Sequence, residues 1–538
     1  MAELFDFIVV GAGPAGCVIA SRLAKTPAKP SVLLVEAGGA NENMANLSGA
    51  ERFEIAFREG SPLNWFYKTE PQVKGQVIDY SRGKGLGGST AINFCGWVVG
   101  ADDDYDEWAR LVGDEAFAWK HVKQCLKKIE NFHNDVPQKY RKWFKPKDED
   151  HGIGGAVDIS YQAEWLDICD DLFIAAEQTP GFGINTDVNA GNPIGMGIGT
   201  ACIYSGIRVT SSSAYLQEVT SNLTITTNQQ VEKVIVEGGV ATGIKTIDGS
   251  IFRAKNDVVL CAGALNSPHI LLLSGIGPKE QLEQHGVAQV KQMPEVGQNL
   301  QDHCFGMAGI VVKKKCDQNF KQSPTPMGWF KVPATLSSDE FKELPTAMQE
   351  YLNRPNVPNW EFATLTPFFE GTPLEPDEEV FSGICMMMNP QSRGTVTLKS
   401  SDPKDAPLID PKFLTHPFDK LNAIESMREM LRYMQTPIWK DKTTRTLGWP
   451  RDDTDEAVWE AYSSNLRSSW HMCGTVRMGL DDASCVDSSF RVYGIGRLRV
   501  ADMSVCPLIP NNHSQTTAYV IGELAAEKLV AEHGLDSS

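Results

Sequence analysis

The chain lacks a long uninterrupted apolar run. A membrane-spanning helix needs about eighteen or more consecutive apolar residues, and no segment of this sequence approaches that length. The first ten residues alternate apolar and acidic side chains before a glycine turn, so they have neither the basic start nor the apolar core of a secretory signal. We therefore predict no membrane partner and a cytoplasmic location.

Basic residues are also scarce. The 538 residues include 50 Lys and Arg against 68 Asp and Glu, which gives a formal net charge of −18. Because binding to nucleic-acid phosphates requires a basic surface, we predict no nucleic-acid partner. The total charge does not restrict small substrates, since a local patch can oppose it.

Closely spaced cysteine pairs are absent as well. Twelve cysteines are scattered along the chain without metal-ligand spacing, several of them in apolar segments, so we predict buried, reduced thiols. His121, His133 and His151 fall in a polar stretch rich in Lys and Asp and are predicted at the surface. No metal site is predicted anywhere in the chain.

What the sequence does contain begins at its N-terminus. Residues 5–10 read as an apolar strand, Gly11, Gly13 and Gly16 follow it, and residues 17–24 continue as an amphipathic helix. In this context the first glycine allows a tight turn, the second allows backbone to approach a diphosphate, and the third allows close packing of helix on strand. The start of the helix then offers N–H groups to the diphosphate.

A second apolar strand, residues 31–35, ends at Glu36. A carboxylate at this position can accept hydrogen bonds from ribose hydroxyls and would repel a 2′-phosphate. Strand, glycine turn, helix, strand and acidic residue together predict a site for an adenine dinucleotide. Both NAD and FAD remain open at this point.

Two further segments narrow the choice. Four glycines occur within six residues in the loop 81–93, and a long distinctive segment spans 263–277. With the N-terminal turn, they resemble the signatures of the glucose–methanol–choline (GMC) oxidoreductase family. Segments 296–303, 390–394, 407–410 and 498–504 resemble other landmarks of the family, so the resemblance covers nearly the whole chain.

The resemblance implies FAD. Some members link the flavin covalently through a histidine just before Asn93, but Ile92 stands there, so we predict non-covalent FAD. Many relatives also carry an Arg-Gly pair shortly after that asparagine, where this chain has Val99-Gly100. The residues predicted to bind FAD are Gly11, Gly13, Pro14, Ala15, Gly16, Glu36, Ala37, Arg82, Gly87, Gly88, Ser89, Asn93, Val231, Ala262, Asp502, Asn512, Gln515 and Thr516.

Two of the ten histidines stand at positions that match the family's catalytic pair, His471 and His513. Flavin-dependent oxidation of an alcohol needs a base for the hydroxyl proton while hydride leaves the carbon for flavin N5. A histidine that titrates near neutrality suits this role. By resemblance, His471 is the expected proton acceptor and His513 a hydrogen-bonding partner of the same substrate oxygen. His303 is expected to be structural or adjacent to the flavin.

The expected fold is α/β: a Rossmann-like FAD-binding domain, similar to that of p-hydroxybenzoate hydroxylase, and an α+β substrate domain on an antiparallel sheet. Residues 1–160, 208–305 and 466–538 are assigned to the FAD-binding domain. Residues 161–207 and 306–465 are assigned to the substrate-binding domain.

The predicted function is FAD-dependent oxidation of a primary alcohol, with aromatic and furanic alcohols among the candidates. Dioxygen or another acceptor would reoxidise the flavin, and both monomer and dimer remain open. One alternative is a non-redox enzyme on the same scaffold, because relatives include lyases, a cyclase and a photodecarboxylase. A structural protein with relic FAD is disfavoured by the intact histidine pair, and a nicotinamide dehydrogenase has no use for the second and third motifs.

Overall fold

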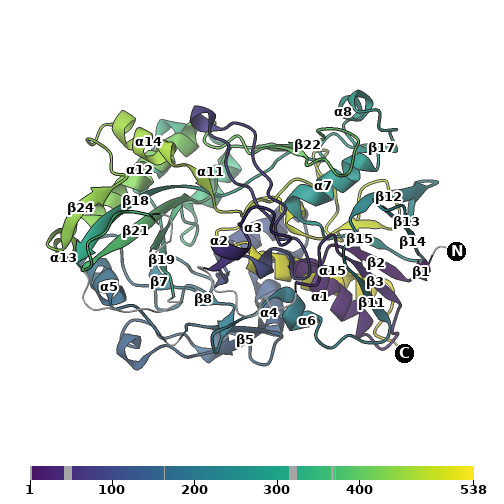
Figure 1. Cartoon of the computed structure of the whole chain (residues 1–538), viewed down its shortest axis with the longest axis horizontal. Coiled ribbons are helices and arrows are strands. Elements are labelled where there is room, and N and C mark those ends of the chain that lie inside the picture. Colours follow the sequence, from purple (N-terminus) through teal and green to yellow (C-terminus); the bar gives the residue numbers. More distant parts are fainter. Residues whose placement is uncertain are drawn as a thin grey trace.

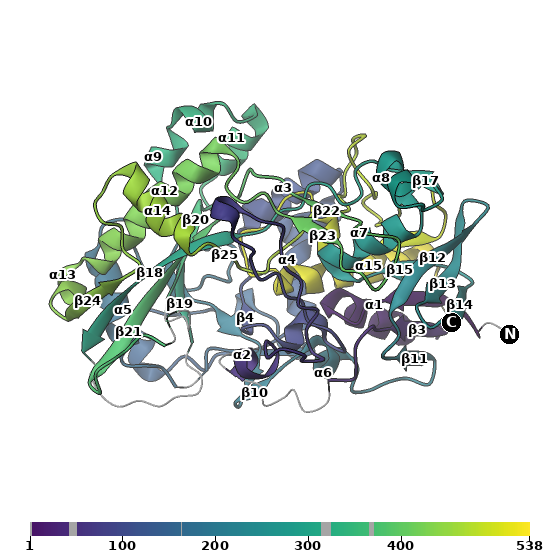
Figure 2. The same cartoon turned by 45° about the horizontal axis from the view of Figure 1, so that its top comes forward.

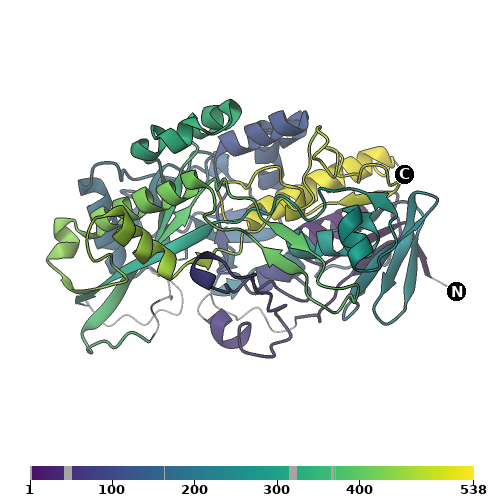
Figure 3. The same cartoon turned by 90° about the horizontal axis from the view of Figure 1, so that it is seen from above.

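The computed structural model describes residues 3–41, 51–162, 164–313, 324–364, 369 and 371–537. Two large sheets lie at opposite ends of the molecule (Figure 1). A parallel sheet and both termini occupy one end, and an antiparallel sheet occupies the other. Seen from above, helices and loops fill the space between the sheets (Figure 3). The predicted α/β fold, with a parallel nucleotide-binding sheet and an antiparallel second sheet, is confirmed.

The parallel sheet has the strand order β11-β3-β2-β15-β26, and every neighbouring pair is parallel. Its central strands are short runs of buried Val, Leu, Ile and Phe, as expected for a sheet covered on both faces. The two strands predicted at the N-terminus are β2 and β3. The bounds are β2 Phe7–Val10, β3 Val32–Val35, β11 Leu223–Thr226, β15 Val258–Leu260 and β26 Leu498–Val500.

Two helices pack together beside this sheet: α1 (Pro14–Ala24), which follows the glycine turn, and α15 (Gln515–Glu532), near the end of the chain. Gly522 of α15 is the point of closest approach. A Cβ added there would lie 2.8 Å from the Cβ of Val18 and 3.0 Å from the Cα of Ala15. The two ends of the chain are therefore joined through the helix that begins the nucleotide site.

A smaller sheet, β1-β14-β13-β12, stands at the outer edge of this half. Strands β12, β13 and β14 lie in the segment 208–305 that was assigned to the FAD-binding domain, and a short helix, α6 (Ser211–Tyr215), precedes them in that segment. Helix α7 (Gly263–Leu273) is formed by the second signature segment. The bounds of the strands are β1 Glu3–Phe5, β12 Val231–Glu237, β13 Val240–Thr246 and β14 Ile251–Ala254.

The antiparallel sheet has the order β24-β18-β21-β20-β19-β7, with β25 paired to β18. Helices α9, α10, α11, α12 and α14 gather over it (Figure 2). The strands are β7 Gly195–Ile198, β18 Cys304–Lys313, β19 Pro326–Phe330, β20 Trp360–Thr364, β21 Glu378–Met387, β24 Thr443–Leu447 and β25 Arg467–Ser468. The helices are α9 Pro333–Leu336, α10 Asp339–Lys342, α11 Thr346–Asn353, α12 Pro417–Met434 and α14 Asp455–Ser464.

The division into two discontinuous domains stays a prediction. Strand β7 lies in a segment assigned to the substrate domain and pairs with β19 of the antiparallel sheet. Strand β25 lies in a segment assigned to the FAD-binding domain but pairs with β18 of the same sheet. The chain passes directly from β25 to His471, so the antiparallel sheet anchors the segment that carries this histidine.

Two further expectations concern membranes and thiols. None of the described helices is both long and apolar enough to cross a membrane. All eleven cysteines within the described ranges are buried and free, which confirms the predicted burial for these residues. Cys316 lies outside the described residues.

The prediction that His151 lies at the surface is wrong. Its ring is buried, stacks on Phe132 at a centroid distance of 3.9 Å, and lies between two carboxylates. Nε2 is 3.0 Å from an oxygen of Asp187 and Nδ1 is 3.6 Å from an oxygen of Glu130. Burial by itself lowers the pKa of His151, but the bonds to Asp187 and Glu130 outweigh it and raise the pKa to about 9. The polar neighbours in sequence gave no sign of this pocket.

Candidate active site

The glycine turn between β2 and α1 has the geometry that its sequence predicts. Gly11 has φ +102°, and a Cβ there would lie 2.5 Å from the carbonyl oxygen of Cys261. A Cβ on Gly16 would lie 1.9 Å from the carbonyl oxygen of Gly11. A Cβ on Gly13, by contrast, meets nothing within 4 Å. The turn is thus closed against protein at two glycines and open at the middle one.

The second glycine-rich segment packs against this turn. The N–H of Gly87 donates to the carbonyl of Ala12 at 2.9 Å, and a Cβ on Gly88 would lie 2.8 Å from the Cα of Gly13. The loop that contacts the glycine turn is therefore more than seventy residues away from it in sequence. Close backbone contact explains why glycines recur in both segments.

Glu36 ties the two glycine segments together. Its carboxylate accepts backbone N–H groups from Ala12 at 2.9 Å, Gly38 at 2.9 Å and Gly85 at 3.0 Å. Burial raises the pKa of Glu36 above its ordinary value, although the three hydrogen bonds act in the opposite direction. The side chain also lines the pocket. Glu36 therefore holds the two glycine segments together, and its predicted contact with a ribose stays a prediction.

One pocket runs from this turn to both candidate catalytic histidines. Most of the residues predicted for FAD and catalysis line it, although they come from five distant parts of the sequence. The predicted residues in its lining are Gly11, Gly13, Pro14, Ala15, Glu36, Ala37, Arg82, Gly88, Ser89, Asn93, Val231, Ala262, His471, Asp502, His513 and Gln515.

Four predicted residues are not part of the lining: Gly16, Gly87, Asn512 and Thr516. Asn512 is buried, and its amide donates to the carbonyl of Val99 at 3.1 Å and to the hydroxyl of Thr517 at 2.8 Å. Val99, which stands where many relatives have arginine, is itself buried and outside the lining.

Asn93 and Gln515 connect the first signature to α15. The Asn93 amide donates to Oε1 of Gln515 at 2.9 Å, and Oδ1 of Asn93 accepts from Arg208 at 2.8 Å. The Gln515 amide donates to the carbonyl of Gly96 at 2.5 Å. This network fixes the start of α15, directly after His513, against the glycine-rich segment.

His471 is held by a strained turn. Trp470, the residue before it, has φ +60°, its carbonyl accepts from Arg82 at 2.5 Å and its indole donates to Asp79 at 2.9 Å. The His471 N–H donates to Asp302 at 2.8 Å. Its Nδ1 lies 3.0 Å from Nδ1 of His303, so one of these two nitrogens carries hydrogen and the other accepts it.

Both histidines of that pair favour the neutral form. Burial, followed by the charges of His513, His303 and Arg82, lowers the pKa of His471 well below its ordinary value. Burial and the charge of His513 lower the pKa of His303 to about 3. This departs from the expected titration of His471 near neutrality, because the sequence could not show how deeply the ring is buried.

His513 lies beside His471, with ring centroids 5.1 Å apart. The two rings come from different segments, one after β25 and one before α15, and both line the pocket. The Nε2 of His513 is 2.9 Å from Oε1 of Glu361, a side chain that is 0% exposed. Its Nδ1 lies next to Gly96, since a Cβ there would be 3.0 Å from this nitrogen.

Comparison with known sequences decides the family. The sequence model described as GMC oxidoreductase matches residues 5–305 with its N-terminal part and 390–522 with its C-terminal part. The chain belongs to the GMC oxidoreductase family. The resemblance inferred from the sequence is thereby confirmed, and FAD is the cofactor typical of this family.

Full-length relatives agree with this placement. An uncharacterised GMC-type oxidoreductase of Mycobacterium tuberculosis is 34% identical, covering 97% of this chain and 98% of the relative. An alcohol dehydrogenase (acceptor) of Pseudomonas putida is 31% identical, covering 98% and 96%. Among solved structures, a pyridoxine 4-oxidase from Mesorbium loti superposes with a TM-score of 0.83 at 26% identity, covering 97% of this chain and 98% of that one.

The pocket of this GMC oxidoreductase fits a flavin dinucleotide in two respects. Space is open at Gly13, where a diphosphate would approach the backbone and the start of α1. Further along, the side-chain oxygen of Gln229 is buried in the lining and has no hydrogen-bond partner among the described residues. A bound group with donors near that oxygen would satisfy it.

Sequence reasoning missed several residues of the site. Trp65, Phe94 and Trp470 add aromatic rings to the lining, and Arg52 lies among rings, with its guanidinium carbon 4.0 Å from the centroid of Phe94. Glu361 is the most consequential omission. Its one signal is an acidic residue between two aromatic residues of a strand, and only the fold brings that strand to His513.

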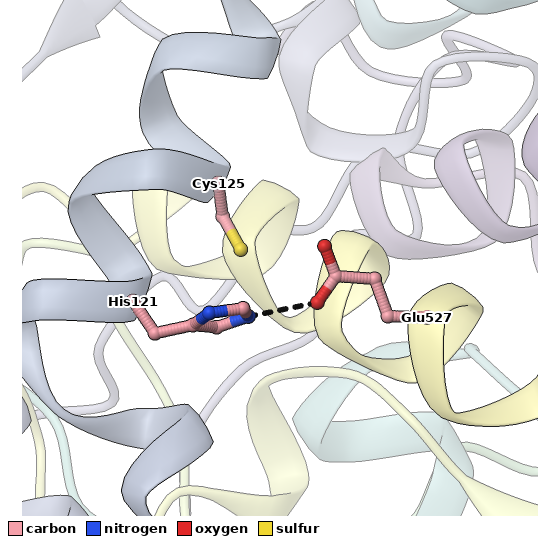
Figure 4. A group of neighbouring side chains, drawn as sticks. All are labelled: His121, Cys125 and Glu527. Atoms are coloured by element: carbon pink, nitrogen blue, oxygen red, sulfur yellow. Dashed lines mark hydrogen bonds and ion pairs between the residues drawn. The ribbon is translucent and has the colours of Figure 1, made fainter. Parts of the chain in front are cut away.

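One further cluster lies apart from the pocket (Figure 4). His121 and Cys125 of α4 (Trp119–Ile129) and Glu527 of α15 point toward one another, with ligand-type atoms within 4.8 Å. His121 and Cys125 are four residues apart on one helix, so their side chains lie on the same face. However, Glu527 already pairs with His121 at 2.8 Å and with Lys128, and burial raises the pKa of the Cys125 thiol to about 12. Ion pairing accounts for this arrangement.

Proposed function

We propose that this GMC oxidoreductase oxidises a primary alcohol with FAD, and that dioxygen or another acceptor then reoxidises the flavin. The observation that carries the proposal is the meeting of His471 and His513 in the pocket that begins at the glycine turn. Two similar proteins carry the names of oxidoreductases whose substrates are alcohols, an alcohol dehydrogenase and a pyridoxine 4-oxidase. FAD, when bound, would supply the acceptor for the hydride that leaves the alcohol carbon.

In this proposal His471 receives the hydroxyl proton. When the hydrogen of the His303–His471 contact resides on Nδ1 of His471, its Nε2 is the unprotonated nitrogen. The bonds to Asp302, and those that Arg82 and Asp79 make with Trp470, hold the ring in place before substrate arrives. A fixed base within hydrogen-bonding reach of the hydroxyl is what general-base catalysis needs.

The proposal also covers how the cofactor is held. The turn at Gly11–Gly16 and the start of α1 would bind the diphosphate, Glu36 the ribose, and the region around Asn93 and Gln515 the flavin. Ile92, which lines the pocket, has no atom able to bond covalently to a flavin, so FAD is proposed to be non-covalent. Apart from Pro403, the residues that line the pocket come from the segments assigned to the FAD-binding domain.

Aromatic lining favours aromatic or furanic alcohols as substrates. Trp65, Phe94 and Trp470 line the pocket, and Trp470 directly precedes His471. Flat rings pack against such side chains in offset or edge-to-face arrangements. The name of the pyridoxine oxidase agrees with an aromatic substrate.

The test is a screen of alcohols with the purified, FAD-loaded protein. Benzylic and furanic primary alcohols, an aliphatic alcohol and choline are each mixed anaerobically with the enzyme while the visible flavin absorbance is recorded. We expect bleaching by the aromatic or furanic compounds, and peroxide on admission of air if dioxygen is the acceptor. If none of the alcohols bleaches the flavin while dithionite does, the proposal fails and non-redox chemistry on this scaffold becomes the better account.

A further inference from the structure

Asp104 is a carboxylate buried in the first turn of α3 (Asp102–Val112), outside the pocket lining. Three donors meet its two oxygens. The backbone N–H of Asn511 donates to Oδ2 at 2.7 Å, the side-chain amide of Asn511 donates to Oδ1 at 2.7 Å, and the hydroxyl of Tyr351 donates to Oδ1 at 2.8 Å. An ionised carboxylate only accepts hydrogen bonds, so this set of donors suits the charged form.

Asn511 connects this carboxylate to the pocket. It is 0% exposed and stands two residues before His513. Its side-chain oxygen accepts from the amide of Asn389 at 2.7 Å, so both ends of the Asn511 amide and its backbone N–H are bound. Only Asn512 separates this fixed residue from His513. The position of the Asn511 backbone therefore limits where the imidazole of His513 can lie.

Gly100 shows how tightly the segment before His513 is packed. Its φ is +89°, and a Cβ there would lie 3.0 Å from Cβ of Asn512 and 3.2 Å from the carbonyl oxygen of Asn511. The amide of Asn512 donates to the carbonyl of Val99, in the same loop. The segment is thus held by two neighbouring parts of the chain, the loop that leads into α3 and the first turn of α3 itself.

Tyr351 of α11 lies between two acceptors. Its hydroxyl oxygen is 2.8 Å from Oδ1 of Asp104 and 3.1 Å from Oδ1 of Asn389. If Asp104 takes up a proton, it becomes a donor itself, and the hydroxyl can turn its own hydrogen to Asn389. Asp104 can therefore carry a proton without leaving a buried donor unbonded, which would be costly.

The carboxyl of Asp104 changes charge near pH 6. Burial raises its pKa to about 6 from an ordinary value of 3.8, although the bonds from Asn511 and Tyr351 act in the opposite direction. Hydrogen bonds to a charged acceptor are roughly twice as strong as those to a neutral one. Protonation therefore weakens the bonds that hold Asn511.

The groups that face Asp104 from other elements keep their charge in this range. The hydroxyl of Tyr351 stays neutral, since burial and the charge of Asp104 raise its pKa well above the ordinary value, and the other partners are amides. Arg354, which follows α11, is paired with Glu107 of α3 at 2.6 Å. The titratable groups beside Asp104 on α3 itself are Asp103, Tyr105 and Glu107. The donors of Asn511 thus meet one titratable acceptor, Asp104.

We propose that Asp104 is a positioning residue: its carboxylate anchors Asn511, and protonation weakens this anchor and moves the imidazole of His513 out of place. This inference rests on the proposed function for its effect on flavin reduction, where His513 is the expected hydrogen-bonding partner of the substrate oxygen. The anchor itself can be tested without substrate. The enzyme should lose activity below about pH 6 while its fold stays intact.

The first experiment detects the titration by urea unfolding of the FAD-loaded wild type and of Asp104→Asn, between about pH 5 and 7.5. Because folding raises the pKa of Asp104, the folded chain binds the proton more tightly, so lowering the pH stabilises the wild type. We expect its urea midpoint, relative to that of Asp104→Asn, to rise as the pH falls from about 7 to about 5. A constant difference would overturn the proposal.

The second experiment locates His513 in crystal structures of the FAD-loaded wild type and Asp104→Asn, both at about pH 7.5. The asparagine keeps the shape of the side chain but replaces one acceptor oxygen with a donor, which opposes an N–H group of Asn511. We expect residues 511–513 to be displaced in the variant, with His471 in place because Asp302 accepts its backbone N–H. An unmoved His513 would overturn the positioning role whatever the substrate is.

The third experiment follows the limiting rate of flavin reduction between pH 5 and 8, with whichever alcohol bleaches the wild type. A misplacement of about 1 Å can cost about 10²-fold in rate. We expect the wild-type rate to fall below about pH 6. Asp104→Asn should be slower by about 10- to 10²-fold at pH 7.5, with a smaller change in KM and without the fall on the acid side. The same acid-side fall in this variant would contradict the proposal.

Tyr351→Phe tests the direction of the effect. It removes a bond that lowers the pKa of Asp104, so the fall in rate should move to higher pH. Tyr433→Phe is the matched control, because Tyr433 is also 0% exposed and its hydroxyl donates to the carbonyl of Leu172 at 2.5 Å, away from Asp104. The control should keep the wild-type profile. An unshifted profile in Tyr351→Phe would count against the anchor.

The outcomes separate the two proposals. Bound FAD and the melting temperature show whether each variant has folded; if Asp104→Asn has not, the shift in Tyr351→Phe, measured by unfolding and by rate, decides the question. If the titration and the displacement of His513 are both observed but no alcohol reduces the flavin, the alcohol-oxidation proposal fails while the positioning role of Asp104 stands.

Discussion

The two histidines of the pocket lie in opposite surroundings. His471 is enclosed by another imidazole and a guanidinium, and His513 is bonded to a buried carboxylate. Neighbouring titratable groups whose environments differ in this way can divide the acid and base duties of a reaction. The residues that impose the difference, His303 and Glu361, come from two strands of the antiparallel sheet or their ends.

His471→Ala tests the base at the scale of one residue. Removing a positioned general base costs typically about 10²–10⁴-fold. We expect flavin reduction by alcohol to fall by at least about 10²-fold, with FAD content unchanged, in anaerobic stopped-flow measurements. His285→Ala, which alters a histidine outside the pocket, is the matched control. Near-normal reduction in His471→Ala would show that another group takes the proton.

His151 makes a separate prediction about stability. Its pKa is raised to about 9 from an ordinary 6.5, chiefly by Asp187 and Glu130 acting against burial. Because the pKa is raised, the protonated ring of His151 contributes its full stabilisation below about pH 6.5. That contribution is lost as the pH rises through about 9. We expect His151→Gln to lower the free energy of unfolding more at about pH 6 than at about pH 10, with a difference on the order of 3 kcal/mol.

Urea unfolding at the two pH values measures this effect. The control is His133→Gln, since His133 pairs with Asp158 at a half-exposed position where ion pairs contribute little. An equal loss of stability for His151→Gln at both pH values would mean that packing on Phe132, rather than the charge of the ring, determines its contribution.

At the scale of elements, the contact between α1 and α15 connects the segment that carries His513 with the glycine turn of the predicted cofactor site. The start of α15 follows His513, and the start of α1 follows the glycine turn. Their closest point is Gly522, where Val18 and Ala15 leave no room for a methyl group. The contact therefore joins the helix that follows His513 to the helix that follows the glycine turn.

Gly522→Ala puts this contact to the test. Alanine is the better helix former by about 1 kcal/mol, but overpacking a tight interface typically costs about 1–3 kcal/mol. Because the added Cβ would meet backbone as well as a side chain, we expect net destabilisation and weaker FAD binding. Thermal unfolding and FAD titration measure both. Gly183→Ala, where nothing lies within 4 Å, should change neither; a stabilised Gly522→Ala would contradict the account.

At the scale of the whole molecule, one pocket gathers residues from nearly the full length of the chain. A ligand held by all of them binds the folded state and not the unfolded one, so it stabilises the fold by mass action. FAD in about 100-fold excess over its Kd should add about 2.7 kcal/mol to the free energy of unfolding. The increase in melting temperature should grow with FAD concentration.

The linkage of FAD is tested on the same preparation. Acid precipitation of the FAD-loaded protein should leave the yellow cofactor in the supernatant, because Ile92 offers no covalent attachment. Flavin fluorescence of the pellet and supernatant after digestion measures the partition. Flavin that stays with the washed, denatured chain would refute non-covalent binding.

Local patterns in the sequence determined much of this protein. The strand–turn–helix around Gly11 and the second strand ending at Glu36 were predictable, because glycine conformations and apolar periodicity act over a few residues. The family, and with it the parallel and antiparallel sheets, followed from motifs. Only the tertiary structure decided that Glu361 meets His513, that His303 meets His471 and that His151 is buried between carboxylates. Those contacts join strands and loops far apart in sequence, where burial and charge depend on packing that no local pattern reports.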